Sequence, residues 1–341
     1  MRHFLLQGIY SQFVRARRRY FQRRPDLRRR LTAPVISIGN LTVGGSGKTP
    51  LVGEIARLLL AMGERPSILS RGYGRLSPTD GVVVVSDGRE IRTDVAHAGD
   101  EPYMLARTVP GAVVAVNASR YLAGRVAETQ LGCTVHLLDD GFQHLQLMRD
   151  IDLLVAPPGD FVNTGTLPFG RFREPLDAAT AADALLVPCD DLADAGSRQE
   201  MARRLRVKTA FGFTRTVDGP SPRASEANRG TPVFAFAGIA KPQDFFAELE
   251  RAGWQLAGRR AFPDHHRYSR EDLNALQRQA DECGAASLVT TSKDAVKLQN
   301  AIPIVEIPLH ISLEPAFAGW LQERLANARA GAGRRGPRDQ T

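Results

Sequence analysis

A glycine-rich segment followed by lysine and threonine is the strongest chemical signal in this 341-residue sequence. It reads Gly44-Gly-Ser-Gly-Lys-Thr-Pro50 and follows the apolar run 34–38. Glycines let backbone N–H groups approach phosphate oxygens, Lys48 adds a positive charge, and the Thr49 hydroxyl suits Mg²⁺. Apolar residues after Pro50 recur at helical spacing, which places the loop at a helix N-terminus, where anions are favoured. The predicted nucleotide-binding residues are Thr42, Val43, Gly44, Gly45, Ser46, Gly47, Lys48, Thr49 and Pro50.

Two positions in this loop bear on its class. The eight-residue P-loop pattern has glycine where this chain has Thr42, and the nearest earlier glycine is Gly39. The alternative to a phosphate site is a tight connection between a strand and a helix. Val43 stands where membrane-recruited partitioning ATPases carry an additional lysine, which argues against that class.

An acidic pair ends another apolar run, at residues 135–141. A P-loop needs a carboxylate at the end of a second strand to hold Mg²⁺ or its water, and either Asp139 or Asp140 is suitable. Asp-Gly is also turn chemistry, so a surface turn is the alternative. The presence of Lys48 and Thr49 in the same chain favours the metal site.

Two further segments carry groups for acid–base chemistry. Asp100 lies at the start of a predicted helix, two residues before Pro102, where the pattern alone favours an ordinary N-cap. Asp264 is followed by His265 and His266, and a histidine beside a carboxylate can orient it or take its proton. The pattern alone favours a polar loop there, and adjacent histidines without paired cysteines make a poor zinc site.

Arginine-containing loops at 70–75 and 167–175 are the remaining site candidates. Arginines at the carboxyl ends of strands point into the crevice where ligands bind and suit phosphate recognition. Solvated loop arginines are an equally good interpretation. The candidate substrate-binding residues are Arg71, Arg75, Arg120, Arg173 and Glu174.

Apolar runs alternating with helical segments must position these groups. The alternation predicts an α/β fold of the P-loop NTPase type, with a mainly parallel sheet and helices on both faces. The runs expected to form its further strands are 67–70, 82–85, 112–116, 135–138, 151–155 and 184–187.

Composition divides the chain into regions. Residues 217–232 are rich in Pro, Gly and Ser and predict a linker between a nucleotide-binding domain at 31–216 and a smaller α/β domain at 233–329. The tail 330–341 has little apolar content, so we expect disorder there. The three cysteines are far apart and odd in number, which fits a reducing, cytoplasmic setting.

Residues 1–30 form a basic arm that carries the excess charge of the chain. They hold ten arginines against one acid, Asp26, whereas the net charge of the whole chain is +8. Leu5, Ile9 and Phe13 follow one another at helical spacing, over far fewer than the ~20 residues needed to cross a bilayer. We expect a basic amphipathic helix on a membrane surface. The alternatives are a transit peptide, a nucleic-acid arm or a solvated helix packed on the body, and the near-neutral remainder argues against nucleic acid.

Seven motifs in chain order together resemble the tetraacyldisaccharide 4'-kinase family, the lipid A kinases of Gram-negative bacteria. In that family the missing first P-loop glycine is itself a trait. The chain departs from the family pattern at residues 170–172 and at Ala240. The motifs are Ile38-Gly-Asn40 with Gly44-Gly-Ser-Gly-Lys-Thr-Pro50, Ser70-Arg-Gly-Tyr-Gly-Arg75, Gly99-Asp-Glu-Pro102, Leu138-Asp-Asp-Gly-Phe-Gln-His144, Arg173-Glu-Pro175, Asp264-His-His266 and Thr291-Ser-Lys-Asp294.

The resemblance implies an activity, its cofactors and its location. It implies transfer of the ATP γ-phosphate to the 4'-hydroxyl of a tetraacyldisaccharide 1-phosphate, giving lipid IVA, at the cytoplasmic face of the inner membrane. It further implies that Asp100 is the base, assisted by His265, that Asp139 and Asp140 serve Mg²⁺, and that domain closure completes the site. The alternative function is a P-loop ATPase or GTPase acting as a switch or chaperone.

Overall fold

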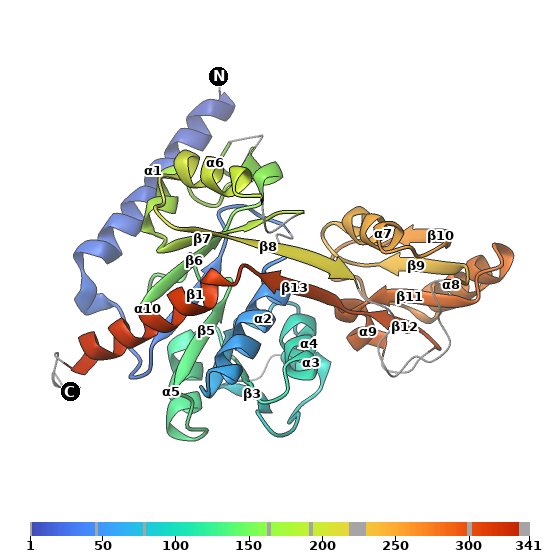
Figure 1. Ribbon diagram of the computed structural model, residues 1–341, viewed down its shortest axis with the longest axis horizontal. Helices are drawn as coiled ribbons and strands as arrows, with labels where there is room; N and C mark the ends of the chain where they lie inside the picture. The colour runs from blue at the N-terminus through green and yellow to red at the C-terminus, as the bar shows by residue number, and fades with distance from the viewer. Residues whose placement is uncertain are drawn as a thin grey trace.

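The computed structural model describes residues 2–44, 47–77, 80–161, 165–190, 194–217, 230–298 and 302–333. They form a large domain and a smaller one that lie side by side along the longest axis of the molecule (Figure 1). Gly45 and Ser46 of the predicted phosphate loop, residues 218–229 of the predicted linker and residues 334–341 of the tail lie outside the described residues.

A nine-stranded sheet forms the centre of the large domain, in the order β13-β8-β7-β6-β1-β5-β2-β4-β3. Its seven inner strands are parallel, and the two edge strands, β3 and β13, are antiparallel to their neighbours. The predicted strands are confirmed, whereas β8 and β13 were not predicted. The strands are β1 (Val35–Gly39), β2 (Pro66–Ser70), β3 (Val83–Asp87), β4 (Val113–Val116), β5 (Val135–Asp139), β6 (Ile151–Val155), β7 (Ala184–Pro188), β8 (Ala210–Val217) and β13 (Leu309–Leu313).

Helices cover both faces of this sheet, because its strand residues alternate between two apolar cores. Ile36 and Ile38 pack on the face covered by α2 (Lys48–Ala61), α4 (Asp100–Thr108) and α10 (Ala316–Gly333). Leu154 and Leu185 pack on the opposite face, with α6 (Gly196–Leu205). A sheet covered on both sides needs apolar residues at successive strand positions, because neighbouring side chains point to opposite faces. Also present are α1 (Arg2–Arg23), α3 (Val95–Ala98), α5 (Arg120–Thr129) and the 3₁₀ turns η1 (Pro25–Leu27), η2 (Pro158–Phe161) and η3 (Leu176–Ala181).

The smaller domain has a parallel sheet of its own, in the order β10-β9-β11-β12. Its two faces are covered by α7, through Phe246 and Leu249, and by α8, through Leu276. Its elements are β9 (Val233–Ala237), α7 (Pro242–Arg251), β10 (Leu256–Ala261), α8 (Arg270–Glu282), β11 (Ser287–Thr291), α9 (Ser292–Leu298) and β12 (Val305–Ile307).

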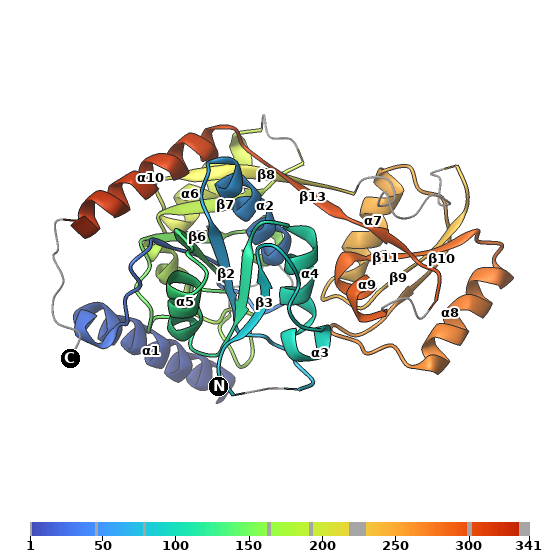
Figure 2. The same ribbon diagram turned by 90° about the horizontal axis from the view of Figure 1, so that it is seen from below.

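The last segment of the chain returns to the large domain, so the predicted boundary of the smaller domain at residue 329 is wrong. Strand β13 pairs with β8, and α10 buries Phe317 and Leu321 against the large sheet. An apolar pattern identifies a strand or helix but not the sheet it joins. Helix α10 also continues to Gly333, so the tail predicted from residue 330 begins too early. Together β8 and β13 run as a two-stranded ribbon between the domains (Figures 1 and 2).

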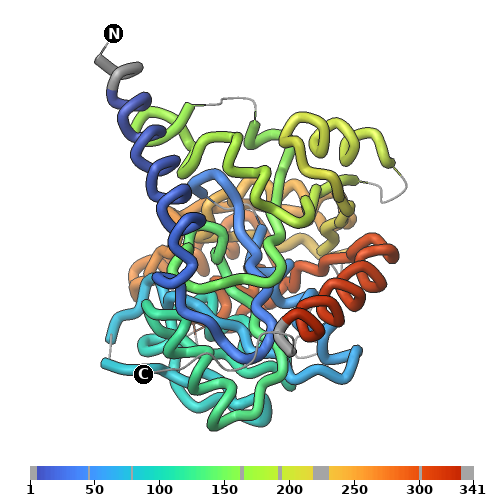
Figure 3. Tube along the Cα trace, turned by 90° about the vertical axis from the view of Figure 1, so that its left-hand side faces the viewer, coloured from blue at the N-terminus to red at the C-terminus, as the bar shows by residue number. Residues whose placement is uncertain are grey.

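Helix α1 packs along the outside of the large domain (Figure 3). Its polar side chains face the protein: Tyr10 donates to the carbonyl of Arg173 at 3.0 Å, and Ser11 lies 2.9 Å from the hydroxyl of Thr166. Ile9 and Phe13 face solvent, with 58% and 66% of their surfaces exposed. The arm is therefore a docked helix with an open apolar side.

Candidate active site

The phosphate loop connects β1 to α2 as predicted, and the ends of β1 and β5 approach closely. A Cβ atom at Gly39 would lie 2.5 Å from the Cβ of Phe142, which immediately follows the acidic motif, so only glycine fits there. Gly47 has a φ of 72°, and a Cβ there would lie 2.9 Å from the guanidinium of Arg215 on β8. These glycines permit both the loop conformation and its close contacts.

A cleft of about 2010 Å³ runs between the carboxyl edge of the large sheet and the smaller domain. Its lining includes Lys48 and Asp139 from the large domain and His265 from the smaller one. Site residues therefore come from both domains. The other predicted site residues that line it are Gly44, Gly47, Thr49, Pro50, Arg71, Arg120, Asp140 and Arg173.

Two predicted nucleotide-binding residues lie behind the loop. The Thr42 hydroxyl donates to the buried carboxylate of Asp160 at 2.8 Å. The backbone N–H of Val43 donates to the carbonyl of Arg171 at 2.8 Å, so it is already occupied. The polar groups of these two residues are bonded within the protein, and neither residue lines the cleft.

Two predicted substrate-binding residues also lie outside the cleft lining. Glu174 is buried and forms an ion pair with Arg18 of α1 at 2.7 Å. The Arg75 side chain folds back over Gly72, with its Nε 2.9 Å from where a Cβ on that glycine would be. The Glu174 side chain is thus paired within the protein, whereas the Arg75 side chain packs against its own loop, and the spacing of charges along the sequence shows neither.

Lys48 lies at the end of a chain of hydrogen bonds that passes through Thr42. Its Nζ donates to Oδ1 of Asn40 at 2.9 Å, and the amide of Asn40 donates to the Thr42 hydroxyl at 3.1 Å. The chain ends at Asp160, which also pairs with Lys241 of the smaller domain at 3.3 Å. Thr42, the residue in place of the first P-loop glycine, thus links Lys48 to the domain interface.

The acidic pair follows β5 and lies beside the phosphate loop, because Asp139 stands opposite Ile38 of β1. Asp139 is 4% exposed, and burial together with the charges of Glu101 and Asp140 raises its pKa. Burial also raises the pKa of Asp140, but the charges of Lys48 and Arg173 lower it by more than burial raises it. The pKa of Asp140 is therefore lowered overall. The Arg173 guanidinium donates to Asp140 at 2.6 Å.

These carboxylates suit Mg²⁺, which binds through one or two carboxylates while phosphates and water supply its other ligands. A divalent cation beside Asp139 would favour the ionised carboxylate that burial disfavours. Thr49, in the same cleft lining, has a hydroxyl that could serve as a third oxygen donor. Within the described ranges no group of three or more His, Cys, Asp and Glu side chains is arranged to hold a metal.

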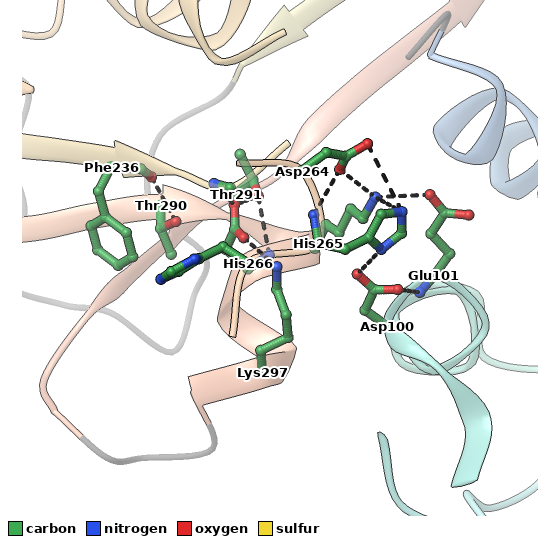
Figure 4. A network of polar contacts seen from close by, with 12 residues as sticks. Asp100, Glu101, Phe236, Asp264, His265, His266, Thr290, Thr291 and Lys297 are labelled. Atoms are coloured by element: carbon green, nitrogen blue, oxygen red, sulfur yellow. Dashed lines mark hydrogen bonds and ion pairs between the residues drawn. The ribbon is translucent and has the colours of Figure 1, made fainter. Parts of the chain in front are cut away.

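Asp100 and His265, 165 residues apart, meet across the domain interface (Figure 4). Nδ1 of His265 lies 2.9 Å from Oδ2 of Asp100, and Oδ1 of Asp100 accepts the N–H of Glu101 at 3.0 Å. Gly99 is the N-cap of α4 and Asp100 is its first residue, so the N-cap favoured by the pattern is wrong. His265 has a φ of 59°, an uncommon conformation for a non-glycine residue, and strain of this kind gathers at functional sites.

The charges of this pair reinforce each other. Burial raises the pKa of Asp100, but the hydrogen bond to His265 and the charge of Lys293 outweigh it and lower the pKa overall. The hydrogen bond to Asp100 raises the pKa of His265 against the opposing effect of its burial. Asp100 is 6% exposed and does not itself line the cleft, whereas its partner His265 does.

Sequence reasoning missed several groups at the interface. Lys293 Nζ donates to Oε1 of Glu101 at 2.9 Å, which adds another bridge between the domains. Lys293 belongs to the motif 291–294, which indicated the family resemblance but no role for this lysine. Asp160 and Lys241 carry no local signal, because only the packing of the two domains brings them together. His144 also lines the cleft, and burial with the surrounding arginines lowers its pKa to about 4.

A phosphate loop, an acidic pair on the neighbouring strand and a carboxylate–histidine pair completed by a second domain define a P-loop phosphotransferase. The profile of one family, tetraacyldisaccharide-1-P 4'-kinase, matches residues 4–326. The chain belongs to this family.

Individual relatives agree with that assignment. The chain is 41% identical over 292 residues to the tetraacyldisaccharide 4'-kinase of Pelobacter propionicus, covering 85% of this chain and 81% of the relative. It is 40% identical over 315 residues to the enzyme of that name from Geobacter sulfurreducens, covering 91% and 88%. Its fold matches the LpxK of Aquifex aeolicus, crystallised in complex with ATP, at a TM-score of 0.75 and 29% identity, covering 95% of this chain and 98% of that one. The chain is therefore a kinase of lipid A biosynthesis, and the switch or chaperone alternative is not favoured.

Proposed function

We propose that the kinase reaction takes place in the cleft between the two domains and that the Asp100–His265 pair supplies its base. The observation that carries the proposal is the 2.9 Å contact between His265 Nδ1 and the Asp100 carboxylate. Only the packing of one domain on the other creates it. Closure of the cleft therefore assembles the base at the moment the substrates are enclosed.

The donor side of the site is the phosphate loop. Backbone N–H groups at the start of α2 favour the phosphates of ATP, and Lys48 adds a charge close to where the γ-phosphate would lie. Thr49, Asp139 and Asp140 would hold Mg²⁺, which neutralises charge on the transferred phosphoryl group. Arg173 keeps Asp140 ionised through its 2.6 Å contact.

The acceptor side is the dyad with the arginines around it. Asp100 stays a carboxylate because its pKa is lowered, so it can accept the proton of the 4'-hydroxyl as that oxygen attacks phosphorus. His265 orients the carboxylate. Arg120 lines the cleft, and its buried Nε has no hydrogen-bond acceptor in the described part of the chain. A buried donor without an acceptor is suited to bind an anionic ligand. Arg71, in the same lining, would assist it.

The membrane side is the exposed face of α1. Leu6, Ile9 and Phe13 are 48%, 58% and 66% exposed, on a helix that also carries many arginines. Such a helix suits the headgroup region of an anionic membrane. Within the described ranges, the helices are all too short or too polar to span a bilayer. We propose that the enzyme binds peripherally at the cytoplasmic face of the inner membrane, where its lipid substrate resides.

Transfer of labelled phosphate tests the reaction. The full chain is given labelled ATP, Mg²⁺ and tetraacyldisaccharide 1-phosphate in detergent micelles. Asp100→Asn should lower kcat by about 10²-fold or more, since a general base contributes on that scale, while ATP still binds. Asp281→Asn, on the exposed surface of α8, is the matched control and should retain normal turnover. Normal turnover by Asp100→Asn would refute the base assignment.

A further inference from the structure

Lys293 of the smaller domain stands between three groups of the dyad region. Its Nζ lies 2.9 Å from Oε1 of Glu101, 3.2 Å from Oδ1 of Asp264 and 3.3 Å from Nε2 of His265. The side chain is 14% exposed. Figure 4 shows His265 directed at Asp100, with Glu101 and Asp264 close by. The phosphate and metal roles described above do not use this lysine, and the base role uses only its charge, which helps to lower the pKa of Asp100.

The helix that carries Lys293 has a rigid start. The next residue, Asp294, is fully buried and accepts hydrogen bonds from the Gly238 N–H at 2.9 Å and the Thr291 hydroxyl at 2.8 Å. The carbonyl of Gly238 in turn accepts the N–H of His265 at 3.2 Å. The segments that carry Lys293 and His265 are therefore both hydrogen-bonded to the backbone of Gly238, which fixes their relative position.

The chemistry of the contact restricts the histidine. A lysine ammonium has donors and no acceptor, so its approach to Nε2 of His265 requires the lone pair of that nitrogen. The proton of the neutral imidazole must then reside on Nδ1, where it donates to Asp100. This tautomer leaves Asp100 as the proton acceptor and His265 as the group that orients it.

We propose that Lys293 is a positioning residue that selects the Nδ1-protonated tautomer of the neutral His265 ring and so assigns the role of base to Asp100. The inference rests on the proposed function for the identity of the reaction, but the tautomer itself is independent of turnover. A proton on Nε2 would set an N–H donor against the donors of the Lys293 ammonium, and Lys293 opposes that state.

The charged groups around the imidazole have opposing effects on the pKa of His265. Asp100 faces it from α4, Lys293 from α9 and Asp264 from its own loop, while the Tyr73 ring lies 5.5 Å away. Glu101 pairs with Lys293, and the charge of Lys297 acts on Asp100. Asp100 raises the pKa of His265 and Lys293 lowers it. Removing the Lys293 ammonium should therefore raise the pKa of His265 and favour a proton on Nε2.

Long-range proton–nitrogen NMR of the full chain labelled at its seven histidines reads the tautomer directly. The His265 signals are assigned by their loss in His265→Gln. Above the pH of its titration, wild-type His265 should carry its proton on Nδ1. In Lys293→Met we expect the Nε2-protonated form to appear and the imidazole to titrate at higher pH. Lys293→Arg keeps charge and donors and should keep the wild-type tautomer.

Kinetics give the second readout. Lys293→Met should lower kcat by about tenfold or more while the KM for ATP changes little, because the base is misoriented and the nucleotide site is intact. Glu101→Gln removes one partner of Lys293 but leaves the ammonium, so the tautomer should persist. If Lys293→Met does not fold, Lys293→Gln replaces it, with thermal unfolding and ATP binding as checks.

Two results would overturn the inference. One is an unchanged His265 tautomer and titration in a folded Lys293→Met protein. The other is a raised KM for ATP with no change at His265, which would make Lys293 a phosphate ligand. Failure of the kinase proposal would appear separately, in the turnover of Asp100→Asn.

Discussion

Arg18 of α1 makes a two-point ion pair with Glu174, with nitrogen–oxygen distances of 2.7 and 2.8 Å. The same guanidinium lies 4.7 Å from the centre of the Phe142 ring. Phe142 directly follows the acidic motif of the proposed metal site. Helix α1, which we propose binds the membrane, therefore contacts the segment that follows Asp139 and Asp140.

Arg18→Ala should destabilise the protein by about 3–5 kcal/mol, because it leaves the Glu174 charge buried without a partner. Thermal and urea unfolding measure this change. Arg15→Ala is the matched control on the same helix, since its pair with Asp177 is largely exposed and should contribute at most about 1 kcal/mol. An equal effect of the two substitutions would show that burial of the Arg18 pair does not matter.

Ile9→Asp with Phe13→Asp should weaken binding to vesicles that contain anionic phospholipid. Each side chain buried at the interface contributes about 1.5–3 kcal/mol, so the loss should be tenfold or more. Vesicle sedimentation measures it. Ile91→Asp, at an exposed apolar position of the β3–α3 loop, is the control. Kinase activity on substrate in detergent micelles should persist in the double variant, and unchanged vesicle binding would contradict the membrane role of α1.

The stability contributed by the Asp100–His265 pair should depend on pH in a definite direction. The pKa of His265 is raised above 6.5, so its contribution is complete below that pH and is lost as pH rises through the raised value. The pKa of Asp100 is lowered from 3.8, so its contribution is present above that pH and is lost as pH falls through the lowered value.

Unfolding temperatures of the wild type and His265→Gln, measured between pH 4 and 9, test this direction. Their difference should be largest in mildly acidic solution and should shrink toward alkaline pH. His97→Gln, whose histidine pairs with Asp94 on the surface, should remain close to the wild type throughout. A difference that grows with pH would show that the sign is wrong.

Much of the donor half of the site could be predicted from the sequence, because it is built from local pattern. A strand, a glycine loop and a helix in succession place Lys48 and Thr49 without any knowledge of distant residues. The acidic pair could be predicted because a P-loop needs a carboxylate at the end of a second strand, although the same pattern also suits a surface turn. In the tertiary structure Lys48, Thr49 and Asp139 line the cleft, whereas Thr42 and Val43 do not.

The acceptor half depended on contacts that no local pattern encodes. Asp100 at a helix start resembles an N-cap, and His265 in a polar loop resembles a solvated side chain, until the domain interface brings them within 2.9 Å. Glu174 has the pattern of a site residue, but in the structure it is paired with Arg18. The segment that forms β13 was assigned to the smaller domain, but it pairs with β8 of the large sheet.

The sequence by itself thus determined an α/β pattern with a predicted phosphate loop and, through its seven motifs, which family the chain resembles. Only the tertiary structure decided which charged side chains face the cleft, which are paired within the protein and where Lys293 lies relative to the dyad. The physical reason is range. A helix, a strand or a phosphate loop is specified by residues within a few positions of one another, whereas an interdomain ion pair forms only after sheet order, the return of the chain and domain packing have been fixed.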